Sequence, residues 1–106
     1  MSATIIVFPT SAFLQAELRR WSTAARAIAG WCVLLQPDGA LVGHTEVGQA
    51  YADIGLEGSS EGAWQVVRGT GGWDLVYLRD GREWAFKSLT DALEAVCRTR
   101  GPGVAA

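Results

Sequence analysis

The chain is poor in the residues that most often carry catalysis or crosslinks. Its 106 residues include one histidine and two cysteines. The cysteines, Cys32 and Cys97, lack the close spacing of a zinc site. We expect them to be reduced, buried thiols, although the sequence leaves a single disulfide between them open. No acidic stretch matches the alternating oxygen ligands of a calcium loop, so the sequence predicts neither a metal nor a cofactor.

An excess of basic charge and long hydrophobic runs are also missing. Nine Lys and Arg residues stand against 11 Asp and Glu, for a formal net charge of −2. This balance argues against broad, nonspecific nucleic-acid binding, which needs a basic footprint, and leaves room only for a local patch. No apolar run reaches the ~18 residues of a membrane span, and the run at residues 5–8 is too short for a secretory signal. We therefore expect a cytoplasmic protein with no membrane partner.

Hydrophobic residues, at 49% of the chain, are sufficient for a folded core. The pattern predicts a single α+β domain over residues 1–101 and a flexible tail over residues 102–106. We expect about five to six mostly antiparallel strands with two main helices on one face. The expected order is strand, helix, strand, strand, a short helix or loop, three strands and a final helix.

The first part of the chain suggests a strand, a helix and a hairpin. Residues 3–8 are β-branched and aromatic and predict a strand that ends at Pro9. Residues 10–29 predict a helix, after which residues 31–36 predict a strand buried on both faces. The first strand, helix and second strand together resemble a βαβ crossover. The turn at Pro37-Asp38-Gly39 then predicts that residues 40–44 return as the hairpin partner of residues 31–36. The apolar stripe of the helix consists of Leu14, Leu18, Trp21, Ala25 and Ile28.

The middle of the chain carries the weakest pattern. Val47, Tyr51 and Ile54 recur at helical spacing and predict a short helix. The rest of residues 45–62 suggests a long loop, a type of segment that is often functional. A further strand is expected at residues 63–68.

The stretch Gly72–Cys97 carries the most consistent signals. Asp80-Gly81 predicts a two-residue type I′ turn, which fixes the hairpin register. In that register Tyr77 faces Trp84, Leu75 faces Phe86 on the core face, and Asp74 faces Lys87 on the other. Ser88 is expected to cap a helix whose apolar stripe comprises Leu89, Ala92, Leu93, Val96 and Cys97.

This last hairpin and helix resemble a known DNA-binding pattern. Trp73-Asp74-Leu75-Val76 and the helix entry from Phe86 to Ala92 are similar to the AP2-like arm domains of tyrosine integrases. The resemblance covers about a quarter of the chain and implies nucleic-acid binding through the hairpin sheet. The family's sheet is typically basic, whereas Asp74, Asp80 and Glu83 intervene here, so we do not assign the chain to that family.

Five tryptophans are the unusual feature of the composition. They either fill a small core or gather at strand ends as a binding surface, because tryptophan dominates both settings. The leading hypothesis is a non-enzymatic domain that binds a protein partner or itself, with a homodimer as the simplest assembly. The candidate surface for a partner or ligand consists of Trp31, His44, Tyr51, Trp64 and Trp73.

Two other functions remain open at this point. One is nucleic-acid binding by an arginine patch formed by Arg19, Arg20, Arg26, Arg79 and Arg82. The other is a small-ligand or catalytic pocket beneath the 45–62 loop, with His44, Tyr51 and Asp53 near it. The sequence favours a non-enzymatic protein because no nucleophile is placed beside the lone histidine.

Overall fold

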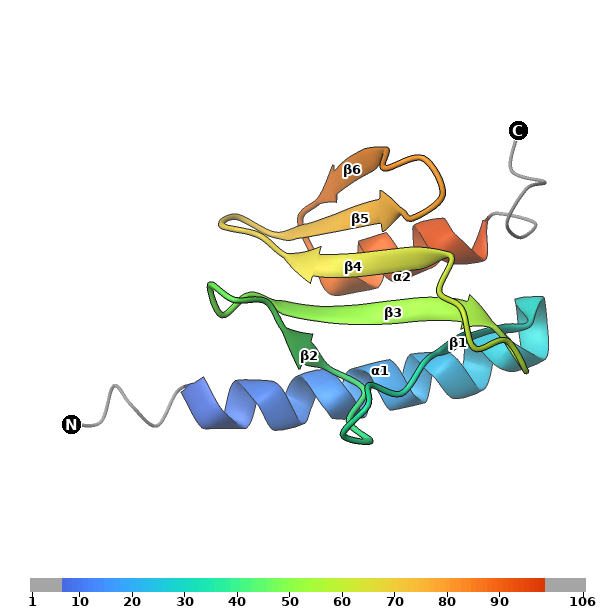
Figure 1. Ribbon diagram of the computed structural model, residues 1–106, viewed down its shortest axis with the longest axis horizontal. Helices are drawn as coiled ribbons and strands as arrows, with labels where there is room; N and C mark the ends of the chain where they lie inside the picture. The colour runs from blue at the N-terminus through green and yellow to red at the C-terminus, as the bar shows by residue number, and fades with distance from the viewer. Residues whose placement is uncertain (1–6, 99–106) are drawn as a thin grey trace.

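The computed structural model describes residues 7–98, which form two helices and one six-stranded antiparallel sheet (Figure 1). This arrangement confirms the predicted single-domain α+β class. In chain order the elements are α1 (Val7–Ala29), β1 (Trp31–Val33), β2 (Gly43–His44), β3 (Ala50–Leu56), β4 (Trp64–Arg68), β5 (Trp73–Tyr77), β6 (Glu83–Phe86) and α2 (Leu89–Cys97). The predicted tail, residues 102–106, lies outside the described residues.

Helix α1 begins earlier than the sequence predicts. The strand expected at residues 3–8 is wrong where the structure describes it, because Val7 and Phe8 already belong to α1. Residues 3–6 lie outside the described residues. Pro9 stands in the first turn of the helix, where an N–H group has no intrahelical partner to lose. The βαβ crossover is also wrong, because every pair of strands in residues 7–98 is antiparallel.

The end of α1 is as predicted. The helix stops at Ala29, and Gly30 follows it with a φ of +78°, the left-handed conformation that glycine adopts without strain. Leu14, Leu18 and Ala25 are buried as expected, but Ile28 is 79% exposed. The buried hydroxyl of Ser22 accepts a hydrogen bond from the N–H of Val33 at 3.0 Å, which fastens α1 to β1.

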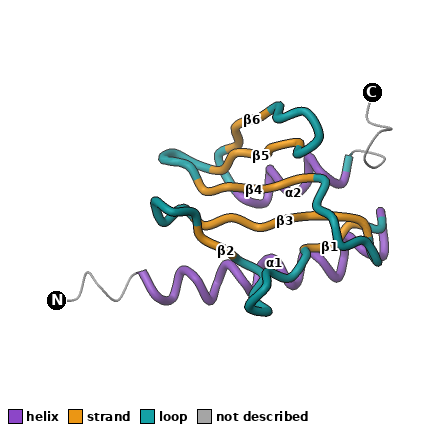
Figure 2. The backbone as a smooth tube through the Cα atoms, viewed as in Figure 1, coloured by secondary structure: helices purple, strands orange, loops and turns teal. Residues whose placement is uncertain are grey.

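The sheet runs in the order β1-β3-β4-β5-β6, and β2 also pairs with β3 (Figure 2). The hairpin predicted between residues 31–36 and 40–44 is therefore wrong. Trp31 lies opposite Leu56, and His44 lies opposite Ala50, so both short strands pair with the long strand β3. The predicted turn does form, with Gly39 at a φ of +88°. It carries the chain from one end of β3 to the other.

Strand β3 occupies the centre of the 45–62 segment, including Tyr51 and Ile54 of the predicted short helix, so that helix is wrong. Ala50, Ala52 and Ile54 are buried, whereas Tyr51 and Asp53 between them are half-buried. Burial that alternates from one residue to the next is typical of a strand with one face in the core. The helical spacing in the sequence was misleading because two of the inward positions are alanine, which gives a weak hydrophobic signal.

The β5–β6 hairpin forms with a register two residues away from the predicted one. Leu75 lies opposite Trp84, and Asp74 lies opposite Ala85 and not Lys87. The loop is longer than two residues: Tyr77 N–H donates to the carbonyl oxygen of Arg82 at 2.9 Å. A type I′ turn needs positive φ at both central residues, but only the glycine of the Asp-Gly pair adopts it. A shift of two leaves every side chain on its predicted face.

Both helices cover the same face of the sheet, as predicted. Helix α1 packs against β1, α2 packs against β4, β5 and β6, and the two helices contact each other. The core lies between these layers. Its largest fully buried side chains are those of Leu18, Trp31, Ile54, Val66, Leu93 and Val96.

Helix α2 forms as the sequence predicts. The Ser88 hydroxyl oxygen accepts a hydrogen bond from the N–H of Asp91 at 3.1 Å, which is the expected N-cap. Leu89, Ala92, Leu93 and Val96 are buried along one side of the helix. The two cysteines are free thiols, with Cys32 buried and Cys97 half-buried.

Candidate functional site

A cavity of about 250 Å³ lies between the β5–β6 hairpin and helix α2. We call it the aromatic pocket, because four of its seven lining residues are aromatic. Its size is slightly below that of typical small-molecule pockets and suits a single side chain. It is lined by Trp64, Leu75, Tyr77, Arg82, Trp84, Phe86 and Ala95.

Strand alternation brings these side chains together. Trp64 lies opposite Tyr77 across β4 and β5, and Leu75 lies opposite Trp84 across β5 and β6. Paired residues in neighbouring strands point to the same face, here the face that α2 covers. The Trp64 ring centroid lies 4.7 Å from that of Tyr77 and 6.0 Å from that of Trp84. The small side chain of Ala95 in α2 leaves the space between helix and sheet open.

One polar atom in the wall of the pocket is unsatisfied. Trp64 is 5% exposed, and its indole Nε1 has no hydrogen-bond partner within residues 7–98. An indole N–H only donates, and a buried donor without an acceptor costs about 1–3 kcal/mol. Because that atom is itself buried, the surface that the pocket offers to a bound group is mainly apolar, with Arg82 at its rim.

Arg82 forms the charged rim of the pocket. Its guanidinium carbon lies 5.5 Å from the Trp84 ring centroid and 5.9 Å from that of Tyr77, within cation–π range. Its Nε also lies 2.8 Å from a carboxylate oxygen of Asp80. The backbone N–H of Arg82, which donates to the same carboxylate, holds the pKa of Asp80 below its usual range. The guanidinium thus lies beside both aromatic rings and the carboxylate of its own loop, with most of the side chain exposed.

The pocket lies beside an open edge of the sheet. Strand β6 pairs only with β5 among the described strands. Because Tyr77 N–H donates to the carbonyl of Arg82, the alternation of an antiparallel ladder points the N–H and C=O groups of Glu83 and Ala85 away from β5. Trp84, between them, is 40% exposed. This edge offers both unpaired backbone groups and an aromatic side chain.

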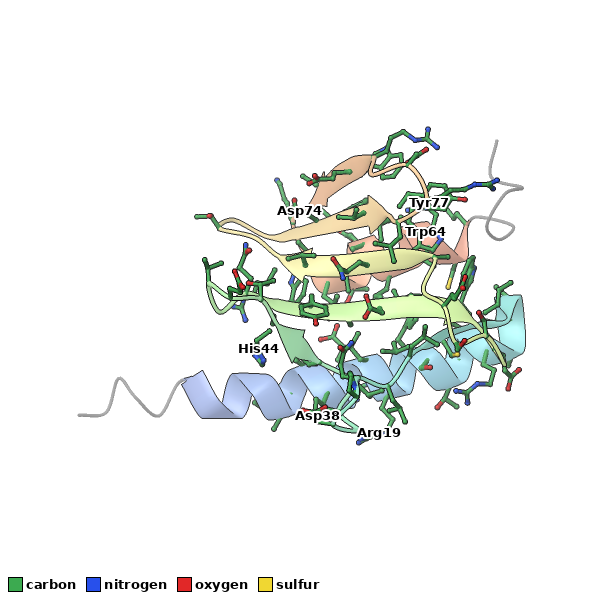
Figure 3. All side chains as sticks on the ribbon, viewed as in Figure 1. Arg19, Asp38, His44, Trp64, Asp74 and Tyr77 are labelled. Carbon is green, nitrogen blue, oxygen red and sulfur yellow. The ribbon has the colours of Figure 1, made fainter. Side chains whose placement is uncertain are left out.

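The five predicted partner-surface residues do not converge. Trp31 is fully buried and Trp64 is 5% exposed, so these two tryptophans belong mainly to the core. Trp73 is half-buried and stacks under Arg68, outside the pocket. His44 is exposed at the end of β2, and Tyr51 lies on the face of β3 away from the helices. In Figure 3, Trp64 and Tyr77 lie together at one end of the sheet, away from His44.

The predicted arginine patch is divided between two regions. Arg19, Arg20 and Arg26 are exposed on α1, which packs at the β1 side of the sheet. Arg79 and Arg82 lie in the loop between β5 and β6, at the opposite edge of the sheet. Arg26 is paired with Glu57, with 3.3 Å between Nε and a carboxylate oxygen. The five side chains therefore do not make one continuous basic surface.

Residues 45–62 include strand β3, and a cavity of about 330 Å³ lies beside Ser59, Glu61 and Gly62 at the end of this segment, but His44, Tyr51 and Asp53 do not line it. Asp53 accepts hydrogen bonds from the side-chain amides of Gln36 at 3.0 Å and Gln65 at 2.9 Å. Tyr51 donates to the other end of Gln36 at 3.4 Å. The carboxylate thus joins β3 to β4 and to the residues after β1. Within residues 7–98 no three His, Cys, Asp or Glu side chains come together as a metal site.

Sequence reasoning missed Trp84, Phe86 and Ala95 as site residues. It placed Tyr77, Trp84 and Phe86 on one face but assigned that face entirely to the core. The available signal was that β6 carries two aromatic residues on a short final strand. The order of strands in the sheet decides which strand is an edge, and that order depends on contacts distant in sequence.

Comparison with known proteins gives no family for this fold and site. No family model matches the chain, and neither curated proteins nor solved structures give a significant match. Within the described residues, neither helix is both long and apolar enough to cross a membrane.

Proposed function

We propose that this chain is a small, non-enzymatic, cytoplasmic interaction domain that binds an extended segment of a protein partner along β6. One side chain of that segment fills the aromatic pocket. The observation that supports the proposal is that the pocket opens directly beside the unpaired edge of β6. Addition of a strand to a sheet edge gives affinity through the backbone and specificity through side-chain pockets.

The residues around the pocket favour this use. Tryptophan, tyrosine and arginine are the residues that most often dominate binding energy at interfaces, and Trp84 and Arg82 are both accessible. The exposed guanidinium of Arg82 donates hydrogen bonds, so it favours acceptor groups such as the carbonyls of an extended peptide. The free thiols of Cys32 and Cys97 fit a reducing compartment.

A library of random twelve-residue peptides displayed on phage tests the proposal. The immobilised domain should enrich peptides with a shared apolar position, because only one side chain enters the pocket. Trp84→Ala should weaken binding of the enriched peptides by about tenfold or more, as expected for an interface hot spot. Val47→Ala is the matched control, since Val47 is 81% exposed at the β2–β3 turn, outside the pocket.

The outcome decides the proposal in either direction. Binding that depends on Trp84 and not on Val47 supports it. A failure to enrich any peptide, or equal binding by both variants, would overturn it. Far-ultraviolet circular dichroism establishes that both variants remain folded.

A further inference from the structure

The residues of β6 and the lysine after it form a pattern that is complementary to itself. Their order is Glu83, Trp84, Ala85 and Phe86, followed by Lys87. The alternation of the ladder points the backbone groups of Glu83 and Ala85 outward, and it points the side chains of Trp84 and Phe86 to the helix face. Lys87 is the first residue after β6, and its backbone still lies close to Gly72, just before β5. Glu83 and Lys87 therefore lie two residues before and two residues after Ala85.

We propose that the segment bound along β6 is β6 of a second copy of this chain, paired antiparallel about a two-fold axis at Ala85. This inference rests on the proposed function and names its partner. A two-fold axis makes each contact occur twice, because residue i meets j and j meets i. The axis brings Ala85 opposite Ala85 of the second copy, and Glu83 opposite Lys87.

The charges select this register among those that the ladder allows. An axis at Ala85 opposes Glu83 and Lys87 directly on the outer face, and opposite charges across a strand pair stabilise it. An axis at Glu83 would oppose two glutamates, which is destabilising. An axis at Trp84 would also bring outward backbone groups opposite one another. Glu83 and Lys87 of the second copy would then be diagonal neighbours and not directly opposite. A one-residue slip would place outward backbone groups against inward ones.

The same register also accounts for the aromatic side chains. Trp84 lies opposite Phe86 of the second copy on the helix face, and the axis repeats the pair. The 40% of Trp84 that is exposed in one copy becomes covered by the other. Aromatic cross-strand pairs add to the stability of the strands that carry them. Because Phe86 lines the aromatic pocket, Trp84 of the second copy is the side chain of the bound segment that lies at this pocket.

Analytical ultracentrifugation tests self-association directly. The chain should sediment as a dimer of twice its 11.3 kDa mass, with dissociation on dilution. Glu83→Lys opposes two lysines at each end of the interface and should raise the dissociation constant by about tenfold. The exchange of both charges, Glu83→Lys with Lys87→Glu, should restore the wild-type constant. These side chains are exposed, so circular dichroism should show unchanged folding.

A crosslink tests the register independently. Residues opposite each other in a hydrogen-bonded antiparallel pair have Cα atoms about 5.5 Å apart, within the range of a disulfide. Ala85→Cys should therefore crosslink two copies under mild oxidation. Glu83→Cys is the matched control: it lies two residues from the axis, so its two copies are too far apart to bond.

Each result supports or overturns the inference. A chain that stays monomeric at about 1 mM, beyond the range of specific association, overturns it. A dimer that is not rescued by the charge exchange, or that crosslinks at residue 83 and not at residue 85, also overturns it. The peptide experiment measures binding of a separate peptide to the immobilised domain, so it decides the proposed function separately.

Discussion

Replacement of Gly72 by alanine would introduce a methyl group where the backbone of β6 passes. A Cβ at this position would lie against the carbonyl oxygen of Phe86 and 3.2 Å from the Cα of Lys87. Both neighbours are backbone atoms, so no rotation of a side chain relieves the contact. Because Phe86 pairs with Trp73 next to Gly72, the last part of β6 must move away from β5.

Gly71 offers a matched control one residue away. A Cβ there would have no atom within 4 Å, and its φ is not in the left-handed range. Gly71→Ala should therefore stabilise the fold by about 0.4–1 kcal/mol, by restricting the unfolded chain. Gly72→Ala gains the same entropic term but adds an overpacking cost of about 1–3 kcal/mol or more.

Urea denaturation followed by tryptophan fluorescence measures this difference. With a urea dependence of about 1–3 kcal/mol per molar for a small domain, the midpoints of the two variants should differ by about 1 M. The midpoint for Gly72→Ala should lie below wild type, and that for Gly71→Ala at or above it. Equal midpoints for the two variants would refute the close approach of β6 to Gly72.

Two further predictions concern helix α2. Ser88→Ala removes the N-cap and should lower the free energy of unfolding by about 1 kcal/mol, whereas Ser60→Ala in an exposed loop should leave it unchanged; equal effects in urea would contradict the cap. Burial, reinforced by the charge of Glu94 and opposed by a hydrogen bond with Trp21, raises the pKa of the Cys97 thiol above its usual range. A raised folded-state pKa contributes stability that is present below the unfolded pKa and is lost as pH rises through the folded value. The rate of Cys97 alkylation by iodoacetamide, measured by mass spectrometry, should reach half its maximum at a higher pH in the folded chain than in guanidinium; coincident midpoints would disprove the shift.

The sequence predicts local structure well where several short-range signals agree. Helix α2 is the best example, since the Ser88 cap and the stripe ending at Val96 form as expected. The turn chemistry of Gly39 and the strand β4 also match their patterns. These features depend on residues within a few positions of one another, which is the range over which propensity and capping operate.

Features that depend on distant contacts could not be predicted in this way. Strand β3 resembles a short helix in sequence because Ala50 and Ala52 give little hydrophobic contrast, and its strand conformation depends on pairing with β1, β2 and β4. The β5–β6 loop is longer than the two-residue turn that the sequence predicts. The side chain of Asp80 accepts a hydrogen bond from the N–H of Arg82, which favours the longer loop.

The candidate site was missed for a related reason. The sequence indicates that Tyr77 and Trp84 share a face of the hairpin, and this is correct. It does not indicate that β6 is the last strand of the sheet or that α2 leaves a space at Ala95. Trp31 on β1 is buried and Trp84 on β6 is 40% exposed, so the accessibility of an aromatic residue on an outer strand depends on the helix packing above it.

The order of the sheet has a consequence for how the chain folds. From β3 to β6, neighbours in space are also neighbours in sequence, and each connecting loop is short. Short loops cost little closure entropy, so each new strand can add to the last without waiting for distant parts of the chain. Strand β1 differs, because its partner residues in β3 are separated from it by the whole of the 34–49 segment. We therefore expect the meander with its capped helix to form first, and α1 with β1 to close the core onto it afterwards.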